Sequence, residues 1–302
     1  MSQNRKKHGI PVNGMLLLDK PSGCSSNQAL QAAKRLLNAR KAGHTGSLDP
    51  IATGLLPICF GETTKISSLF LHADKTYQVG IRLGITTETG DCEGTPLERK
   101  PVDVTVEKIE KVLEHYRGSF EQIPPMYSAL KRNGQPLYKL ARQGIVVERE
   151  PRPVTVYALS LDNLQQDFLQ LTVSCSRGFY VRTLAEDIGR DLGCGGHVET
   201  LRRSKVGDFS IDRAVTMEQL EAIISPSDRA KLLLPTDQGL SHLPEVRLPE
   251  NLARYLQLGQ SVRSTSQALP GLVRLYSETA EFLGLGEITA DRKLAPKRLF
   301  SV

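Results

Sequence analysis

Residues 43–54, GHTGSLDPIATG, constrain the fold of this chain more than any other segment. They hold three glycines and a proline, a composition that suits neither a helix nor a strand. We therefore predict a loop between two ordered elements, in which the backbone can approach a ligand closely. Within it, Asp49 and Pro50 fix a carboxylate in a rigid turn. Taken alone, Asp49 is typical of an Asx turn that has no role in chemistry.

The elements around this loop are predicted from local patterns. Residues 15–19 form an apolar run typical of a strand, and a Pro-Ser-Gly turn follows it. Ser25, with Gln28 three residues later, predicts a capped helix whose apolar spacing continues until Gly43 ends it. A second strand is predicted at 75–83, where apolar and polar residues alternate.

The rest of the first 245 residues mixes helices and strands without strict alternation. We predict helices at 105–117 and 181–192 and strands at 154–160 and 168–175. Residues 118–153 are basic and rich in turns, which is typical of a functional loop. This order of elements predicts an α+β fold with a mixed, largely antiparallel sheet.

The end of the chain differs from the rest. Three prolines spaced over residues 235–249 predict a domain boundary, so we expect one domain at 1–245 and a second at 246–302. Short β-like runs in the second part, separated by glycine and proline, suit a small β-barrel. These runs lie at residue 262, at 272–276 and at 282–288.

Charge favours a polyanionic partner. The chain has 39 Lys and Arg against 33 Asp and Glu, a net charge of +6, and its first 65 residues hold nine basic groups and three acidic ones. Each phosphate that such a cluster neutralises releases a counterion, which favours nucleic acid binding. The alternative is a solvated basic surface with no partner.

Several classes of protein are not expected. The chain has no long apolar run for a membrane span and no apolar stretch behind its basic start for a secretory signal, so we expect a cytoplasmic protein. Its five cysteines are scattered without a CxxC pair and its six histidines without an HxxxH pair, so no metal site is predicted. Rossmann and P-loop patterns are also missing, and we expect no cofactor.

Two further residues matter together with Asp49. Tyr77 lies on the strand predicted at 75–83, and taken alone it is typical of a core tyrosine. Arg182 lies in SCSRGFYVRTL, a strand-to-helix transition, among apolar groups. An arginine there normally forms a surface salt bridge, and a buried one needs an acidic partner, for which Asp49 is the only evident residue.

GHTGSLDPIATGLLP resembles the catalytic motif of the TruB family of pseudouridine synthases. Other motifs that are similar to the family's, in its order, cover residues 12–210. They are GMLLLDKPSGCSS, DKTYQVGIRLG, QIPPMYSALKRNGQPLYKLARQG, SCSRGFYVRTLAEDIGRDLG and GGHVETLRRSKVG. Phe179 departs from the pattern, where the family has a small polar residue.

The resemblance implies a fold, an activity and a partner. The first domain would be a catalytic domain of the pseudouridine synthase type, residues 118–153 a thumb that closes over RNA, and the tail a short PUA domain. The activity would be isomerisation of uridine to pseudouridine at position 55 in the T loop of tRNA, by base flipping and without a cofactor. The tRNA T stem-loop would be the partner of a monomer that needs no protein partner and no membrane.

The resemblance also implies roles for single residues. Asp49 would be the catalytic aspartate, Tyr77 would stack on the target uracil, and Arg182 would pair with Asp49. The residues that it implies in substrate binding are His44, Tyr77, Tyr180, Leu201, Lys20 and Lys65. Asp49 must be ionised whether it attacks a carbon or takes a sugar proton, and we expect Arg182 to keep its pKa near or below about 3.9.

Other functions stay open at this point. An RNA-binding or RNA-folding module without catalysis would have the same basic loops, but it would have no use for Asp49, Tyr77 and Arg182 together. A hydrolase with Asp49 as nucleophile would need a second carboxylate or a metal-binding acidic pair. Within the family, a guide-RNA-dependent catalytic subunit is a closer alternative. The thumb-like insertion and the short tail favour a stand-alone enzyme instead.

Overall fold

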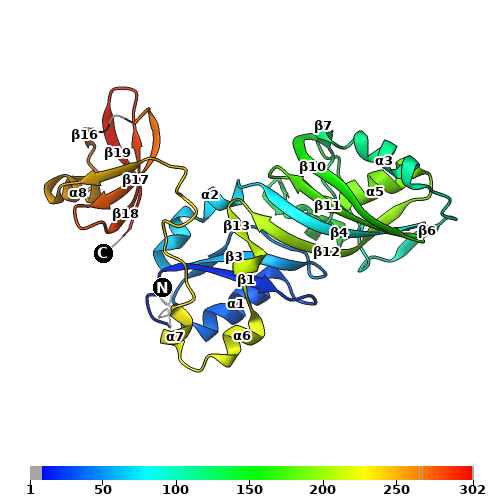
Figure 1. The fold of residues 1–302 in the computed structure, drawn as a ribbon, viewed down its shortest axis with the longest axis horizontal. Coiled ribbons are helices and arrows are strands. Elements are labelled where there is room, and N and C mark those ends of the chain that lie inside the picture. The colour runs from blue at the N-terminus through cyan, green and yellow to red at the C-terminus, as the bar shows by residue number, and fades with distance from the viewer. Residues whose placement is uncertain (1–8, 265, 267, 301–302) are drawn as a thin grey trace.

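A ten-stranded sheet forms the centre of the larger domain in the computed structural model, which describes residues 9–264, 266 and 268–300 (Figure 1). Its strands are β1 (Gly14–Lys20), β2 (Ala42–His44), β3 (Thr53–Phe60), β4 (Lys75–Leu83), β7 (Gly118–Gln122), β10 (Arg152–Gln165), β11 (Phe168–Cys175), β12 (Gly196–Val206), β13 (Phe209–Ser210) and β14 (Val215–Thr216). The main path runs β14-β1-β3-β12-β4-β11-β10-β7, and only the β1–β14 and β3–β12 pairs are parallel. The mixed, largely antiparallel sheet predicted from the sequence is therefore confirmed.

Helices and short turns of helix surround the sheet. They are α1 (Ser26–Leu36), η1 (Gly61–Ile66), α2 (Ser67–Leu71), α3 (Val106–Glu114), α4 (Leu137–Ala141), α5 (Val181–Leu192), η2 (Ile211–Arg213), α6 (Met217–Ala222) and α7 (Pro226–Ala230). Two small hairpins complete the domain: β5 (Ile85–Thr87) with β6 (Pro96–Arg99), and β8 (Lys131–Arg132) with β9 (Gln135–Pro136). No helix among these residues, or in the rest of the described chain, is long and apolar enough to cross a membrane.

The main core lies between the sheet and the pair α3 and α5. Val79 and Ile81 of β4 point into it because side chains two residues apart share a face of a strand. Leu184 and Ile188, one turn apart on α5, belong to the same core and cover this face of the sheet. Each fully buried aliphatic side chain of this kind contributes about 1.5–3 kcal/mol, so the core fixes the position of both elements.

A curled five-stranded sheet forms the smaller domain, drawn in orange and red in Figure 1. Its order is β15-β17-β18-β19-β16, with α8 (Glu250–Gln257) packed on it. The bounds are β15 (Glu245–Leu248), β16 (Val262–Arg263), β17 (Gly271–Ser277), β18 (Phe282–Ile288) and β19 (Lys293–Leu299). This architecture confirms the predicted small β-rich tail, while the boundary between residues 245 and 246 stays a prediction.

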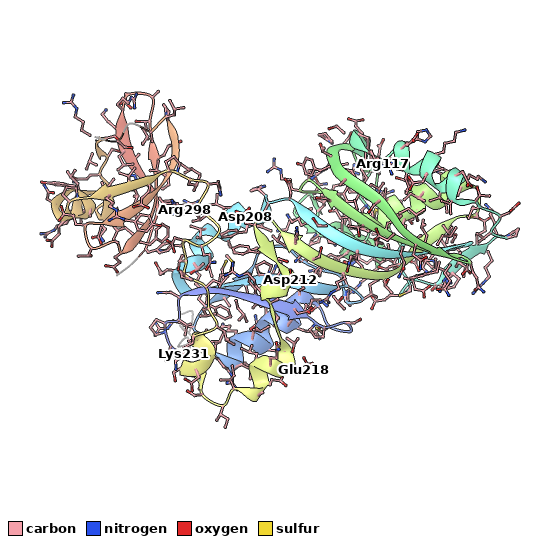
Figure 2. All side chains as sticks on the ribbon, viewed as in Figure 1. Arg117, Asp208, Asp212, Glu218, Lys231 and Arg298 are labelled. Atoms are coloured by element: carbon pink, nitrogen blue, oxygen red, sulfur yellow. The ribbon has the colours of Figure 1, made fainter. Side chains whose placement is uncertain are left out.

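The two domains touch through apolar and polar contacts. Leu285 of β18 belongs to a buried cluster that includes Phe70 and Phe209 of the larger domain. The Lys65 ammonium donates a hydrogen bond to the Leu299 carbonyl at 2.8 Å. Figure 2 labels Arg298, the residue before Leu299, on the smaller domain, and Arg117 on the upper side of the larger one.

The structure corrects two predictions around the first loop. The first helix begins as predicted, with the Ser25–Gln28 capping box, but it ends at Leu36 and not near Gly43. Asn38 turns the chain with a φ of 47°, a conformation that asparagine tolerates better than most residues. Both ends of the segment 43–54 also belong to strands: residues 43–44 to β2, which pairs antiparallel with residues 58–60 of β3, and residues 53–54 to the start of β3. The irregular part is therefore residues 45–52, which we call the Asp49 loop.

The segment 118–153 is also more ordered than its composition predicted. Its first five residues form β7, which pairs with the beginning of β10 and extends the large sheet. The hairpin of β8 and β9 and the short helix α4 account for part of the remainder. Strand β12 and helix α8 were not predicted, since β12 carries charged residues between its buried ones.

We expect Gly54→Ala to destabilise the protein strongly. Gly54 follows the Asp49 loop with a φ of +101°, and a Cβ there would lie 2.3 Å from the Arg203 carbonyl oxygen. Strain and overlap together should cost about 2–5 kcal/mol of unfolding free energy. Gly193→Ala is the control, because Gly193 has a φ of +86° but open space around it, and it should cost only about 1 kcal/mol. Equal denaturation midpoints for the two variants would contradict this close approach.

Candidate active site

A cavity of about 430 Å³ lies between the Asp49 loop, the large sheet and the start of α5. Six of the predicted site residues line it: His44, Asp49, Tyr77, Tyr180, Arg182 and Leu201. Tyr127, Ser128 and Ala129, from the segment 118–153, close another part of its wall. A larger cavity of about 690 Å³ shares Leu201 but holds neither Asp49 nor Arg182, so we place the site in the smaller one.

Asp49 and Arg182 form an ion pair in this cavity. Asp49 Oδ2 lies 3.0 Å from Arg182 Nε, with the Asp49 side chain 39% exposed and the Arg182 side chain 7% exposed. Burial keeps the guanidinium in place, since α5 packs on the core directly beside it. The exposed side of the carboxylate is left free to meet a ligand.

Arg182 has a second acidic partner, which was not predicted from the sequence. Its Nη1 lies 3.6 Å from Oδ2 of Asp91, a carboxylate that is almost fully buried. The Thr89 and Tyr127 carbonyls accept hydrogen bonds from Nη1 and Nη2, at 3.1 and 2.7 Å. The prediction that Asp49 is the only acidic partner of Arg182 is therefore wrong. The turn DCEG around Asp91 was the only sequence signal, and it indicates an Asx turn rather than a site.

The pKa of Asp49 is raised and not lowered, which corrects a second prediction. Burial is the largest cause, and the nearby Asp91 charge adds to it. Arg182 and Lys20 oppose this effect by favouring the ionised carboxylate. The two cations therefore limit a rise in the pKa of Asp49 that burial would otherwise make larger.

Tyr77 stands on β4 and faces the cavity while it packs against the main core. Its strand partner on β12 is Arg203, which is 1% exposed. Arg203 donates hydrogen bonds from Nε to the Leu55 carbonyl at 2.8 Å and from Nη2 to the Gly46 carbonyl at 3.1 Å. This buried guanidinium lies in the motif GGHVETLRRSKVG, but no role was predicted for it. It ties the Asp49 loop and β3 to β12, the neighbour of the strand that carries Tyr77.

Lys20 does not lie where the predicted substrate contact requires it. Its side chain is 0% exposed, and its ammonium donates to the Pro21 and Ala52 carbonyls, both at 2.7 Å. It therefore supports the Asp49 loop from beneath, and a direct contact with substrate does not fit this burial. Lys65 is also outside the cavity, since it pairs with Glu62 and contacts the smaller domain.

His44 and Tyr180 border the cavity with well-fixed geometry. His44 Nδ1 accepts a hydrogen bond from the Gly46 N–H at 3.4 Å, which leaves the proton on Nε2, and burial lowers the pKa of His44. The Tyr180 backbone is held by Gln122, whose Oε1 accepts from the Tyr180 N–H at 2.8 Å. Phe179 beside it packs edge-on against Phe120, with ring centres 6.4 Å apart.

Solved structures show that this fold occurs elsewhere. A chain of an H/ACA RNP bound to a substrate RNA containing 2'-deoxyuridine superimposes with a TM-score of 0.72 at 21% identity, covering 100% of this chain and 92% of that one. A chain of a Cbf5-Nop10-Gar1 complex gives 0.71 at 23% identity, covering 99% and 92%. At these identities the likeness shows that the chain shares the fold of those structures.

Family models and relatives of known name identify the protein family. The model for the TruB family pseudouridylate synthase (N terminal domain) matches residues 34–181. Those for the tRNA pseudouridylate synthase B C-terminal domain and for pseudouridine synthase II TruB, C-terminal, match 182–241 and 244–300. The tRNA pseudouridine synthase B of Stutzerimonas stutzeri is 53% identical over 95% of both chains, and that of Nitrosococcus oceani is 52% identical over 99% of this chain and 98% of its own. The chain belongs to the TruB family of pseudouridine synthases.

Proposed function

We propose that this enzyme converts uridine 55 in the T loop of tRNA to pseudouridine, with Asp49 as the catalytic group. The observation that carries the proposal is the Asp49–Arg182 pair in a cavity that also contains Tyr77. The motifs around these residues and the tRNA-specific names of the relatives support the choice of substrate.

The reaction breaks the bond between C1′ and N1 of uridine and joins C1′ to C5. The C5 proton is lost and N1 gains one, so the step is balanced without an oxidant or a cofactor. The uridine must first leave its stack at a cost of about a few kcal/mol, which stacking on Tyr77 would offset. Ionised Asp49 would then act on the sugar or the base, and Arg182 would keep the carboxylate ionised in the closed site.

The proposal also covers the parts of the molecule outside the cavity. We propose that the basic segment 118–153 grips the RNA as a thumb, and that the domain from residue 246 adds RNA-binding surface as a PUA domain. The enzyme would act in the cytoplasm as a monomer without a protein partner. His44, Tyr180 and Leu201, all in the cavity wall, would contact the flipped nucleotides.

We expect a minimal T-arm hairpin to be modified, because the cavity and thumb recognise a folded loop and its backbone. Its affinity should fall with salt, with a slope of about 0.7–0.9 per phosphate contact in a log–log plot. The measurement is pseudouridine formed on the hairpin and on full tRNA, and a hairpin with cytidine at the target position is the control. Modification of full tRNA but not of the hairpin would contradict recognition of the T arm.

A further inference from the structure

Ser128 places a buried hydroxyl in the wall of the active cavity that has no hydrogen-bond partner. The residue is 5% exposed, and its Oγ is one of only two buried side-chain polar atoms without a partner among the described residues. Burial raises the pKa of Tyr180, and a weak hydrogen-bonding interaction of its phenol with Ser128 opposes this rise, although the two hydroxyls do not reach full hydrogen-bond geometry. A buried hydroxyl without a partner is costly in a folded protein, so it calls for an explanation.

The position of this hydroxyl is fixed by the catalytic pair itself. Arg182, which binds Asp49 through Nε, donates from Nη2 to the carbonyl of Tyr127, the residue before Ser128. The Ser128 N–H donates to the Met126 carbonyl at 2.9 Å, and the Ser128 carbonyl accepts from the Tyr138 N–H at 3.1 Å. The backbone on both sides is thus held, and Ser128 keeps a defined place relative to Asp49.

We infer that the Ser128 hydroxyl binds the target nucleotide, and that substrate supplies the hydrogen bond that the free enzyme lacks. This inference rests on the proposed function, which brings a uridine into the cavity. A serine hydroxyl both donates and accepts, and uridine offers carbonyl oxygens, an N–H and a ribose 2′-hydroxyl. Ser128 is therefore a substrate-binding residue that the segment 118–153 contributes to the cavity wall.

Ser128→Ala separates this role from a structural one. Removing an unpaired buried hydroxyl should raise the melting temperature of the free enzyme by about 2–4 °C. The same change should lower kcat/KM on tRNA by about tenfold, because the bond made with substrate is lost. A structural serine would show the opposite effect on stability and no specific loss of activity.

Thr63→Val is the matched control. Thr63 is also fully buried, but its hydroxyl accepts from the Gly14 N–H and bonds Thr236, both at 2.9 Å, away from the cavity. This variant should lose about 2–4 °C in melting temperature and keep kcat/KM. The contrast between the two variants shows that the Ser128 effect comes from an unpaired hydroxyl and not from any buried hydroxyl.

Two further arms test the direct contact. In a Tyr180→Phe background, Ser128→Ala should still lower kcat/KM about tenfold. No further loss of kcat/KM would mean that Ser128 acts only through the Tyr180 phenol, and this result would overturn the inference. Binding of RNA with 2′-deoxyuridine at the target position then identifies which group of the nucleotide Ser128 contacts. If Ser128→Ala no longer lowers the affinity for this RNA, the partner is the ribose 2′-hydroxyl. If Ser128→Ala still lowers the affinity, the partner is the base.

The activity of the wild-type enzyme distinguishes a failure of the Ser128 inference from a failure of the proposed function. If wild-type enzyme forms pseudouridine and Ser128→Ala retains full kcat/KM, the role of Ser128 is wrong and the proposed function stands. If wild-type enzyme forms none on any tRNA, the proposed function fails first.

Discussion

Asp49→Asn is expected to abolish pseudouridine formation while tRNA binding survives. The amide keeps the volume of the side chain but neither attacks carbon nor accepts a proton at neutral pH, so turnover should fall about 10⁴-fold or more. Binding should persist because, in the proposed function, lysines and arginines outside the cavity make the phosphate contacts. Loss of one negative charge near RNA should raise affinity slightly. The measurement is single-turnover product formation with excess enzyme, beside a binding isotherm on the same tRNA.

Stability provides a second readout for this variant. Burial raises the pKa of Asp49 in the folded protein. Its ionised form at pH 7 therefore opposes folding, and the opposition is relieved as the pH falls through the folded pKa. Asp49→Asn should consequently not lower the melting temperature at pH 7.

Asp19→Asn is the control, since Asp19 pairs with Arg202 at 2.6 Å outside the cavity, and it should retain activity. Substantial product from Asp49→Asn would remove Asp49 as the catalytic group.

Arg182→Met should cause the second largest loss of pseudouridine synthase activity. It leaves Asp49 and the buried Asp91 without their shared cation, and breaking a buried pair typically costs about 3–5 kcal/mol. Part of this loss should appear as lower stability and part as slower catalysis. Arg182 favours the ionised form of Asp49, so the pKa of Asp49 should rise further in the variant. The acid limb of the pH–rate profile should therefore move to higher pH, and activity should recover partly as pH rises.

Arg190→Met is the matched control for Arg182→Met. Arg190 lies on the same helix and pairs with Asp187, but its side chain is 68% exposed, so its loss should change little. An Arg182→Met enzyme with wild-type turnover and an unchanged pH profile would exclude Arg182 from the mechanism. A lowered melting temperature with an unchanged acid limb would assign Arg182 to the fold alone.

Local patterns predicted the elements better than the contacts between them. Strand β4 and helix α5 have the predicted bounds, because alternation and helical spacing are local properties of the sequence. Asp49, Tyr77 and Arg182 were found through motifs, and the structure does bring them to one cavity.

The supporting residues could not be predicted in the same way. Asp91 and Arg203 are single polar residues whose partners lie far away in sequence, so only the tertiary fold pairs them with the site. Lys20 was expected to bind substrate because the resemblance to the family implied it, but its side chain is buried beneath the loop. Burial, which decides between these roles, is not a local property.

The most direct measurement is chemical mapping of pseudouridine, at single-nucleotide resolution, on an unmodified tRNA transcript treated with the wild-type enzyme. We expect pseudouridine at position 55 of the T loop and at no other uridine, and none when the Asp49→Asn variant replaces the wild-type enzyme. Absence of pseudouridine at that position after wild-type treatment would contradict the proposed substrate, and equal product from the Asp49→Asn enzyme would contradict the catalytic role of Asp49.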